Sequence, residues 1–181
     1  HAAMLANQDI IKKNDFEKIQ RGLLKVKDEI KNDKMTFKSE LEDIHTHIET
    51  RLIEIIGPVG KKLHTARSRN DQVSTATRIW AREECIKVDS LLKKLQASLL
   101  KQAEKHINDI MPGFTHLQPA QPILLSHHLL AYVNMFGRDR ENCSSLISRH
   151  NFSPLGSAAL AGTTFNINRE ETANLLGFQG V

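Results

Sequence analysis

The sequence of 181 residues predicts an all-α protein built as a bundle of long helices. Apolar residues recur at steps of three and four over long stretches, as the buried face of an amphipathic helix requires. Aromatic residues make up only 5% of the chain, so the core must consist mainly of Leu, Ile, Val and Ala. That composition favours packed helices over a β-sandwich. We find no segment with a convincing strand pattern.

The first two predicted helices occupy residues 1–30. The first runs to about Gln8. Asn14 caps the second helix and, with Glu17 three residues later, completes a capping box. The apolar face of the second helix then follows the helical period through Phe16, Ile19, Leu23, Val26 and Ile30.

A third helix is expected from a second capping box, Ser39 with Glu42, to the stop signal Gly57-Pro58. His45 lies on or beside the apolar face of this helix. A histidine in such a position is typically a hydrogen-bonded core residue, and the pattern alone favours that interpretation.

The longest helix is predicted from about Gln72 to His106, a length typical of a bundle. Its apolar stripe begins at Trp80 and continues to Ala103. Prolines and Gly113 interrupt the helical pattern over residues 110–122. Another helix is expected over residues 123–150, and a last short one after Asn168.

Composition excludes several classes of protein. The net charge is +4, but Lys and Arg alternate with Asp and Glu, so no basic stripe predicts binding to nucleic acid. No apolar run approaches the roughly 20 residues that span a bilayer. Cys85 and Cys143 stand in apolar stretches and are expected to be reduced thiols of a cytoplasmic protein. Neither His45-x-His47 nor His127-His128 has companion ligands at metal-site spacing, so no metal is expected.

Three polar or small-residue segments are candidates for a functional role. In residues 64–72, two arginines, a serine and an asparagine stand at a helix entry, where exposed N–H groups favour a carboxylate. The alternative is a solvated loop capped by Asn70 or Asp71. In residues 113–122, prolines hold His116 on a stiff loop, where an imidazole suits proton transfer, although a loop histidine is often incidental. The small residues 153–163 indicate either close packing or a ligand, and packing accounts for them.

Together these segments resemble the fumarase/aspartase superfamily, over essentially the whole chain. Residues 42–45 and 57–72 read like the run of the argininosuccinate lyase family within it. Fumarases and aspartases carry Ser-Ser-Asn-Asp where this chain has Ser68-Arg69-Asn70-Asp71, and adenylosuccinate lyases lack the arginine. The Thr-His-Leu-Gln-Pro-Ala-Gln-Pro run at 115–122 and the Pro-Leu-Gly segment at 153–163 complete the resemblance.

The resemblance implies β-elimination of argininosuccinate to arginine and fumarate, without a cofactor. It assigns substrate binding to five residues: Ser68, Arg69, Asn70, Thr115 and Gln118. It implies that His116 takes part in proton transfer and that Thr115 holds the fumarate-forming part of the substrate. It also places His45 near the active site, which counts against the core interpretation.

The resemblance further implies that residues 1–66 are the remainder of an N-terminal helical domain and residues 67–181 the first part of a central bundle domain. The family is tetrameric, with each site built from three subunits. We therefore expect this chain to form a dimer or tetramer, because its long apolar stripes would otherwise be exposed.

One family feature is missing. The family's mobile loop, Ser-Ser-x-Met-Pro-x-Lys-x-Asn, supplies the serine base, and nothing here matches it. Ser144-Ser145 stands in a predicted helix, and Met111-Pro112 lacks the Lys and Asn. We expect the chain to be a truncated piece with little or no activity alone. The alternatives are a non-catalytic, crystallin-like structural member of the same scaffold and a different fumarate-releasing lyase.

Overall fold

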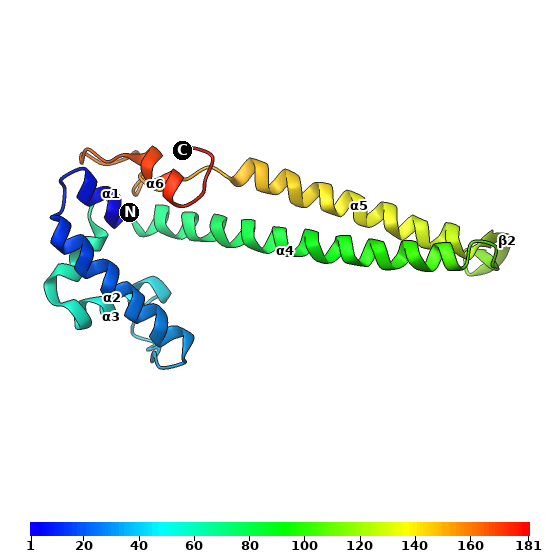
Figure 1. Cartoon of the computed structure of the whole chain (residues 1–181), viewed down its shortest axis with the longest axis horizontal. Coiled ribbons are helices and arrows are strands. Elements are labelled where there is room, and N and C mark those ends of the chain that lie inside the picture. Colours follow the sequence, from blue (N-terminus) through cyan, green and yellow to red (C-terminus); the bar gives the residue numbers. More distant parts are fainter. The chain divides into compact units, whose positions relative to one another are not determined.

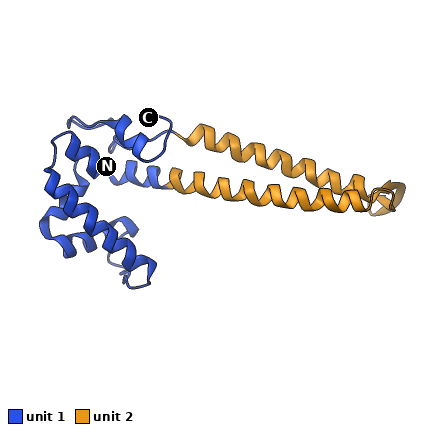
Figure 2. Ribbon diagram, viewed as in Figure 1, with its two compact units in different colours: residues 1–76, 152–181 blue, residues 77–151 orange.

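The computed structural model describes all of residues 1–181 and divides into two compact units. Unit 1 comprises residues 1–76 and 152–181, and unit 2 comprises residues 77–151 (Figure 2). Helices dominate both units, which confirms the predicted all-α class (Figure 1). The elements in chain order are α1 (Ala2–Asn7), α2 (Lys13–Lys31), α3 (Ile44–Ile56), the 3-10 helix η1 (Gly57–His64), α4 (Arg69–Lys105), β1 (Ile110–Thr115), β2 (Gln118–Leu124), α5 (Leu125–His150) and α6 (Arg169–Leu175).

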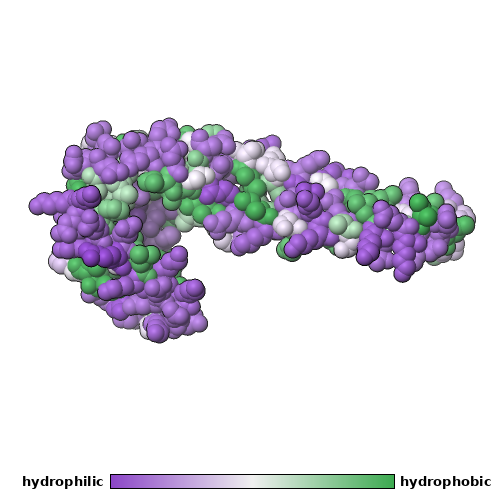
Figure 3. Space-filling model, in the orientation of Figure 1, coloured by the Kyte–Doolittle hydropathy of each residue, from purple (hydrophilic) through white to green (hydrophobic).

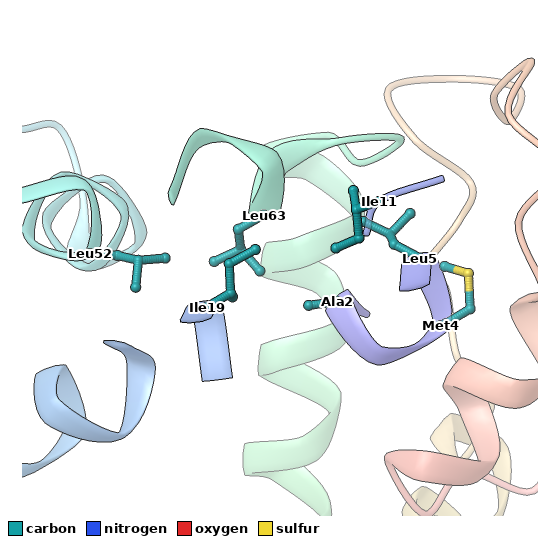
Figure 4. Packing of buried hydrophobic residues seen from close by; sticks show 7 residues of the cluster. All are labelled: Ala2, Met4, Leu5, Ile11, Ile19, Leu52 and Leu63. Atoms are coloured by element: carbon teal, nitrogen blue, oxygen red, sulfur yellow. The ribbon is translucent and has the colours of Figure 1, made fainter. Parts of the chain in front are cut away.

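The core of unit 1 lies among α1, α2, α3 and η1 (Figure 4). Leu5, Ile19 and Leu52 are completely buried there. Removing each such side chain from water stabilises the fold by about 1.5–3 kcal/mol. The rest of the buried cluster consists of Ala2, Met4, Ile11 and Leu63.

The two predicted capping boxes are wrong. α2 begins directly after Lys12 without a side-chain cap, and Asn14 lies inside it. The acidic residue of its first turn, Asp15, instead forms an ion pair of 2.5 Å with Lys62 of η1. α3 begins after Asp43, whose carboxylate accepts a hydrogen bond of 2.6 Å from the Thr46 N–H. Ser39 therefore precedes the helix by several residues. Ser39 and Asp43 are both good capping residues and stand four positions apart, so the sequence pattern alone did not decide between them.

Unit 2 consists of the antiparallel helices α4 and α5 joined by a β-hairpin (Figure 1). Polar contacts tie the helices together: Gln96 donates to the Val133 carbonyl at 2.8 Å, and Arg140 donates to Asp89 at 2.7 Å. The hairpin corrects the expectation that no strand is present. Its prolines are tolerated because each strand of a two-stranded sheet has an open edge that needs no N–H donor. Pro112 even pairs with Pro122.

Much of the apolar stripe predicted on α4 is exposed in the single chain. Trp80 is 62% exposed and Leu91 63% exposed, instead of packing against α5. Figure 3 shows apolar surface recurring between polar residues along these long helices. Despite their length, neither they nor any other helix has a stretch apolar enough to cross a membrane.

The contact between α2 and α3 requires a glycine. A Cβ at Gly22 would stand 2.5 Å from Leu52 Cδ1 and 2.9 Å from Ile56 Cγ2. Gly22→Ala should therefore lower the free energy of unfolding by about 1–3 kcal/mol, although alanine is the better helix former. Gly137→Ala in α5 is the matched control, because its nearest neighbour is Gln96 Nε2 at 3.6 Å. We expect it to stabilise by about 0.5–1 kcal/mol. Urea denaturation followed by circular dichroism measures both, and equal stabilisation by the two changes would contradict this close approach.

Candidate functional site

The first turn of α4 carries three of the predicted site residues. Ser68 caps it, since its hydroxyl accepts from the Asn70 N–H at 3.2 Å. In return, Asp71 Oδ1 accepts from the Ser68 N–H at 3.0 Å, which completes a capping box with an aspartate in the last position. The helix consequently starts at Arg69, three residues earlier than predicted, and the cap is neither Asn70 nor Asp71. Asn70 is exposed to solvent beside this turn.

The carboxylate of Asp71 also holds the small-residue segment 153–163. Its Oδ2 accepts from the backbone N–H groups of Gly156, at 3.0 Å, and Ala158, at 2.8 Å. Gly156 has φ +98°, and a Cβ there would stand 2.7 Å from Arg169 Cγ, so only glycine fits. Asp71 itself is only 3% exposed. The segment therefore packs against the helix start, as the packing interpretation expected.

Glu49 of α3 is the acidic centre of the same region. Its carboxylate accepts from Arg67 Nη2 at 2.6 Å and from Arg69 Nη1 at 3.2 Å, and it lies 3.1 Å from His64 Nδ1. Burial by itself raises the pKa of Glu49, but hydrogen bonds from His64 and Arg69 and the charge of Arg67 outweigh it and hold the pKa below its ordinary value. Glu49 is therefore ionised at neutral pH.

The guanidinium of Arg69 is surrounded by acceptors. Besides Glu49, its Nη1 donates to Gln72 Oε1 at 2.5 Å, and its Nε lies 3.5 Å from Asp43 Oδ2. Of the two terminal nitrogens, Nη2 has the longer contacts, at 3.3 Å from Glu49 Oε2 and 3.4 Å from Thr46 Oγ1. Nη2 is thus the less firmly bound of the two terminal nitrogens, because hydrogen bonds weaken at such lengths.

His45 joins this group through Gln72, whose Nε2 lies 3.2 Å from His45 Nδ1. His45 is half-buried, so the core interpretation offered by the pattern is wrong. The buried histidine of α3 is His47, two positions on, which is 6% exposed. Its Nε2 accepts from the Lys38 N–H at 2.8 Å, and its Nδ1 lies 2.7 Å from the Asp43 carbonyl.

The remaining predicted residues lie in unit 2, at the tip of the hairpin. Thr115 pairs with Gln118, and the two residues between them, His116 and Leu117, have φ +49° and +61°. A turn with two left-handed residues normally takes Asn or Gly, so each side chain there costs roughly 1–2 kcal/mol. All four side chains are exposed, Leu117 to 96%. Such a strained turn presents the His116 imidazole outward from a rigid base.

The hairpin also borders a cavity of about 350 Å³ in unit 2. Thr115 and His128 contribute to its wall. Most of the other lining residues are apolar or small: Met111, Pro112, Gly113, Phe114, Ala120, Gln121 and Ile123. The cavity therefore suits an apolar segment better than a charged ligand.

The predicted site residues thus fall into two groups. Ser68, Arg69, Asn70 and His45 lie together in unit 1, and the hairpin residues Thr115, His116 and Gln118 lie in unit 2. Nowhere do three or more His, Cys, Asp or Glu side chains gather in an arrangement able to hold a metal ion.

Sequence reasoning gave no role to Glu49 and only a cap to Asp71. One signal was available: Glu49 stands four residues after His45, on the same side of α3. Two arginines close to the start of a helix also need acidic partners if either is buried, and Arg67 has a side-chain exposure of only 7%.

Comparison with known proteins supports a common family. A family model described as "Lyase" matches residues 1–181. The chain is 54% identical over 179 residues to argininosuccinate lyase of Bartonella bacilliformis, covering 99% of this chain and 38% of that protein. It is 51% identical over 181 residues to argininosuccinate lyase of Paraburkholderia phytofirmans, covering 100% and 39%. The chain therefore spans less than half the length of these curated relatives.

Solved structures agree on the fold. A variant of EDDS lyase with bound fumarate is 31% identical, with a TM-score of 0.87 over 100% of this chain and 35% of that one. A fumarate lyase:delta crystallin from Brucella melitensis bound to cobalt is 19% identical, with a TM-score of 0.79 over 99% of this chain and 44% of that one. At that identity the second likeness concerns the fold alone.

Asp71→Asn tests the link between the helix start and the segment 153–163. The substitution removes the negative charge of Asp71 and leaves one acceptor oxygen for three backbone N–H groups. We therefore expect the free energy of unfolding to fall by about 2–3 kcal/mol. Hydrogen exchange at the Gly156 and Ala158 amides should quicken. Asp89→Asn is the control, because its ion pair with Arg140 is partly exposed, with side-chain exposures of 35% and 34%. It should cost less than about 1 kcal/mol. Equal losses in the two variants would contradict a special role for Asp71.

Proposed function

Because the chain belongs to the lyase family, we propose that it carries substrate-binding and proton-transfer residues of an argininosuccinate lyase. The observation that carries this proposal is the identity of about half of all residues with argininosuccinate lyases along the whole chain. The reaction is β-elimination. A base removes a proton from the carbon next to a carboxylate, and the electron pair forms the double bond of fumarate. The bond to the guanidinium nitrogen breaks, and that nitrogen takes up a proton to give arginine.

The start of α4 is suited to binding the carboxylates of such a substrate. Exposed Asn70 and the hydroxyl of Ser68 offer neutral polar groups, and N–H groups at a helix start favour an anion. Arg69 adds a positive charge. Its Nη2, the terminal nitrogen with the longer contacts, is the one that we propose donates to a carboxylate, exchanging weak bonds to Thr46 and Glu49 for a stronger one.

Charge develops on a carboxylate when the proton leaves the neighbouring carbon. A positive group already held in place stabilises that charge without reorganising, which is the largest electrostatic contribution in reactions of this type. The ring of acceptors around Arg69 supports this role, because it keeps the side chain from sampling other rotamers. His45 reaches the same group through Gln72 and extends it with a titratable ring.

The hairpin tip is suited to proton transfer. His116 is exposed, and an imidazole is the side chain best suited to accept or donate a proton near neutral pH. Thr115 and Gln118 flank it with a hydroxyl and an amide that can orient a substrate. Residues 1–181 contain no Ser-Ser-x-Met-Pro-x-Lys-x-Asn run, and Ser144 and Ser145 lie inside α5. We therefore assign His116 to proton transfer without naming it as the base that begins the reaction.

A cytoplasmic location fits this metabolic role. Cys85 and Cys143 are both free thiols, which persist in a reducing compartment.

The measurement that tests the function is fumarate release from argininosuccinate, followed by absorbance in the ultraviolet. We expect release by the whole product of the gene that encodes these residues. His116→Asn should lower kcat by about 10²–10⁴-fold. Little release is expected from residues 1–181 alone, since they lack the serine motif. Release from adenylosuccinate or malate, with none from argininosuccinate, would overturn the assignment.

We also propose that the chain self-associates through the exposed apolar residues of α4. In sedimentation equilibrium we expect a dimer or tetramer, and Leu91→Glu should shift it toward monomer because it places a charge in the apolar face. Lys94→Gln is the control, since it changes the net charge equally at an exposed position of the same helix. A monodisperse monomer for the unaltered chain would refute the proposal.

A further inference from the structure

We propose that Glu49 is the positioning residue that holds Arg69 ready for a substrate carboxylate. Glu49 does not itself bind substrate; it acts through Arg69. This inference rests on the proposed function, because it concerns the same binding group at the start of α4. The evidence for it is the geometry of four side chains, those of Glu49, Arg67, Arg69 and Gln72.

Glu49 is held in place by a contact other than the one with Arg69. The guanidinium of Arg67 lies almost wholly inside unit 1, with 7% side-chain exposure, and donates to Glu49 Oε1 at 2.6 Å. A cation so far from water needs an ionised partner, and Glu49 is the carboxylate with which it forms an ion pair. The side chain of Glu49 is itself only 19% exposed. Its carboxylate is therefore a fixed acceptor and not a mobile surface group.

From this fixed position Glu49 contacts Arg69 with both oxygens. Oε1 accepts from Nη1 at 3.2 Å and Oε2 accepts from Nη2 at 3.3 Å. This two-point contact sets the plane of the guanidinium, which a single acceptor leaves free to rotate. Gln72 adds a shorter bond to Nη1 at 2.5 Å. Nη1 thus has the shorter contacts, and Nη2, at 3.3 Å from Glu49 and 3.4 Å from Thr46, is the terminal nitrogen that we assign to a substrate carboxylate.

The charge of Glu49, and not only its shape, is required. A carboxylate offers two acceptor oxygens, and Glu49 uses both, since His64 lies 3.1 Å from Oε2 while Arg67 binds Oε1. The amide of glutamine keeps one acceptor and turns a pair of N–H donors toward two arginines. Glu49→Gln should therefore release Arg69 while preserving the volume of the side chain.

The experiment compares steady-state kinetics of the whole gene product with Glu49→Gln. We expect KM for argininosuccinate to rise about tenfold or more and kcat to fall as well, because a released Arg69 binds the carboxylate less well and no longer stabilises the charge that develops on it. Glu54→Gln is the matched control. It removes a carboxylate from the same helix that pairs with Arg51, 2.8 Å away at the surface. Its KM should equal that of the unaltered protein.

Loss of Glu49 also leaves Arg67 buried without a partner, so the single variant can fail to fold. The double variant Glu49→Gln with Arg67→Gln removes that unpaired cation. If Glu49 positions Arg69, the double variant regains the thermal midpoint and keeps the raised KM. Recovery of both the thermal midpoint and the KM of the unaltered protein would overturn the proposal, because it would show that Glu49 serves only to neutralise Arg67. An unchanged KM in a folded single variant would overturn it too.

A second measurement is independent of catalysis. The Arg69 Nε–H signal in an ¹⁵N spectrum, assigned with Arg69→Lys, should report a rigid side chain in the unaltered protein and a mobile one in either Glu49 variant. The same rigidity in all of them would refute the positioning role. Absence of argininosuccinate turnover by the unaltered protein would refute the proposed function instead, while the Arg69 signal would still decide the role of Glu49.

Discussion

The buried carboxylate of Asp71 is the interaction on which the rest of unit 1 depends. It accepts hydrogen bonds from three backbone N–H groups, one at the cap of α4 and two in the segment 153–163. Those partners stand 3, 85 and 87 residues away along the chain. One side chain thereby begins a helix and closes the unit between its two separate stretches of sequence. These hydrogen bonds fix the first turn of α4. They thereby set the direction in which Ser68, Arg69 and Asn70 leave the backbone.

Charge compensation adds a second constraint on the same turn. Arg67 and Arg69 stand two residues apart, so their side chains leave the backbone in different directions, yet both reach Glu49. Burial of Arg67 lowers its pKa, and the charge of Glu49 opposes that effect. An ion pair removed from water repays its desolvation only when its geometry is good and its other polar atoms are bonded. The carboxylate of Glu49 meets that condition, since both of its oxygens are bonded, whereas Nε of Arg67 is buried without a hydrogen-bond partner.

Sequence reasoning succeeded where short-range physics decides the outcome. Apolar period and glycine or proline stops predicted the long helices, and the short helix predicted after Asn168 is α6. Reasoning failed where several local signals competed or where the partner is distant in sequence. Asp43 rather than Ser39 caps α3, and no pattern pairs Asp71 with Gly156. The hairpin escaped notice because its prolines obscure the strand pattern, although an isolated two-stranded sheet tolerates them. The predicted boundary between residues 66 and 67 stays a prediction.

The two groups of candidate site residues owe their positions to different physics. In unit 1, Arg69 is placed by carboxylates and an amide, so its orientation depends on ionisation and on charge balance. At the hairpin tip, the backbone of His116 is placed by a two-residue turn with positive φ at both positions. Binding a charged group and exchanging a proton are different tasks, and each kind of placement suits one of them. Electrostatic holding suits the first task because it acts on the charge itself. A strained turn suits the second, because it fixes the backbone that carries the imidazole and leaves the ring exposed at the tip of the hairpin.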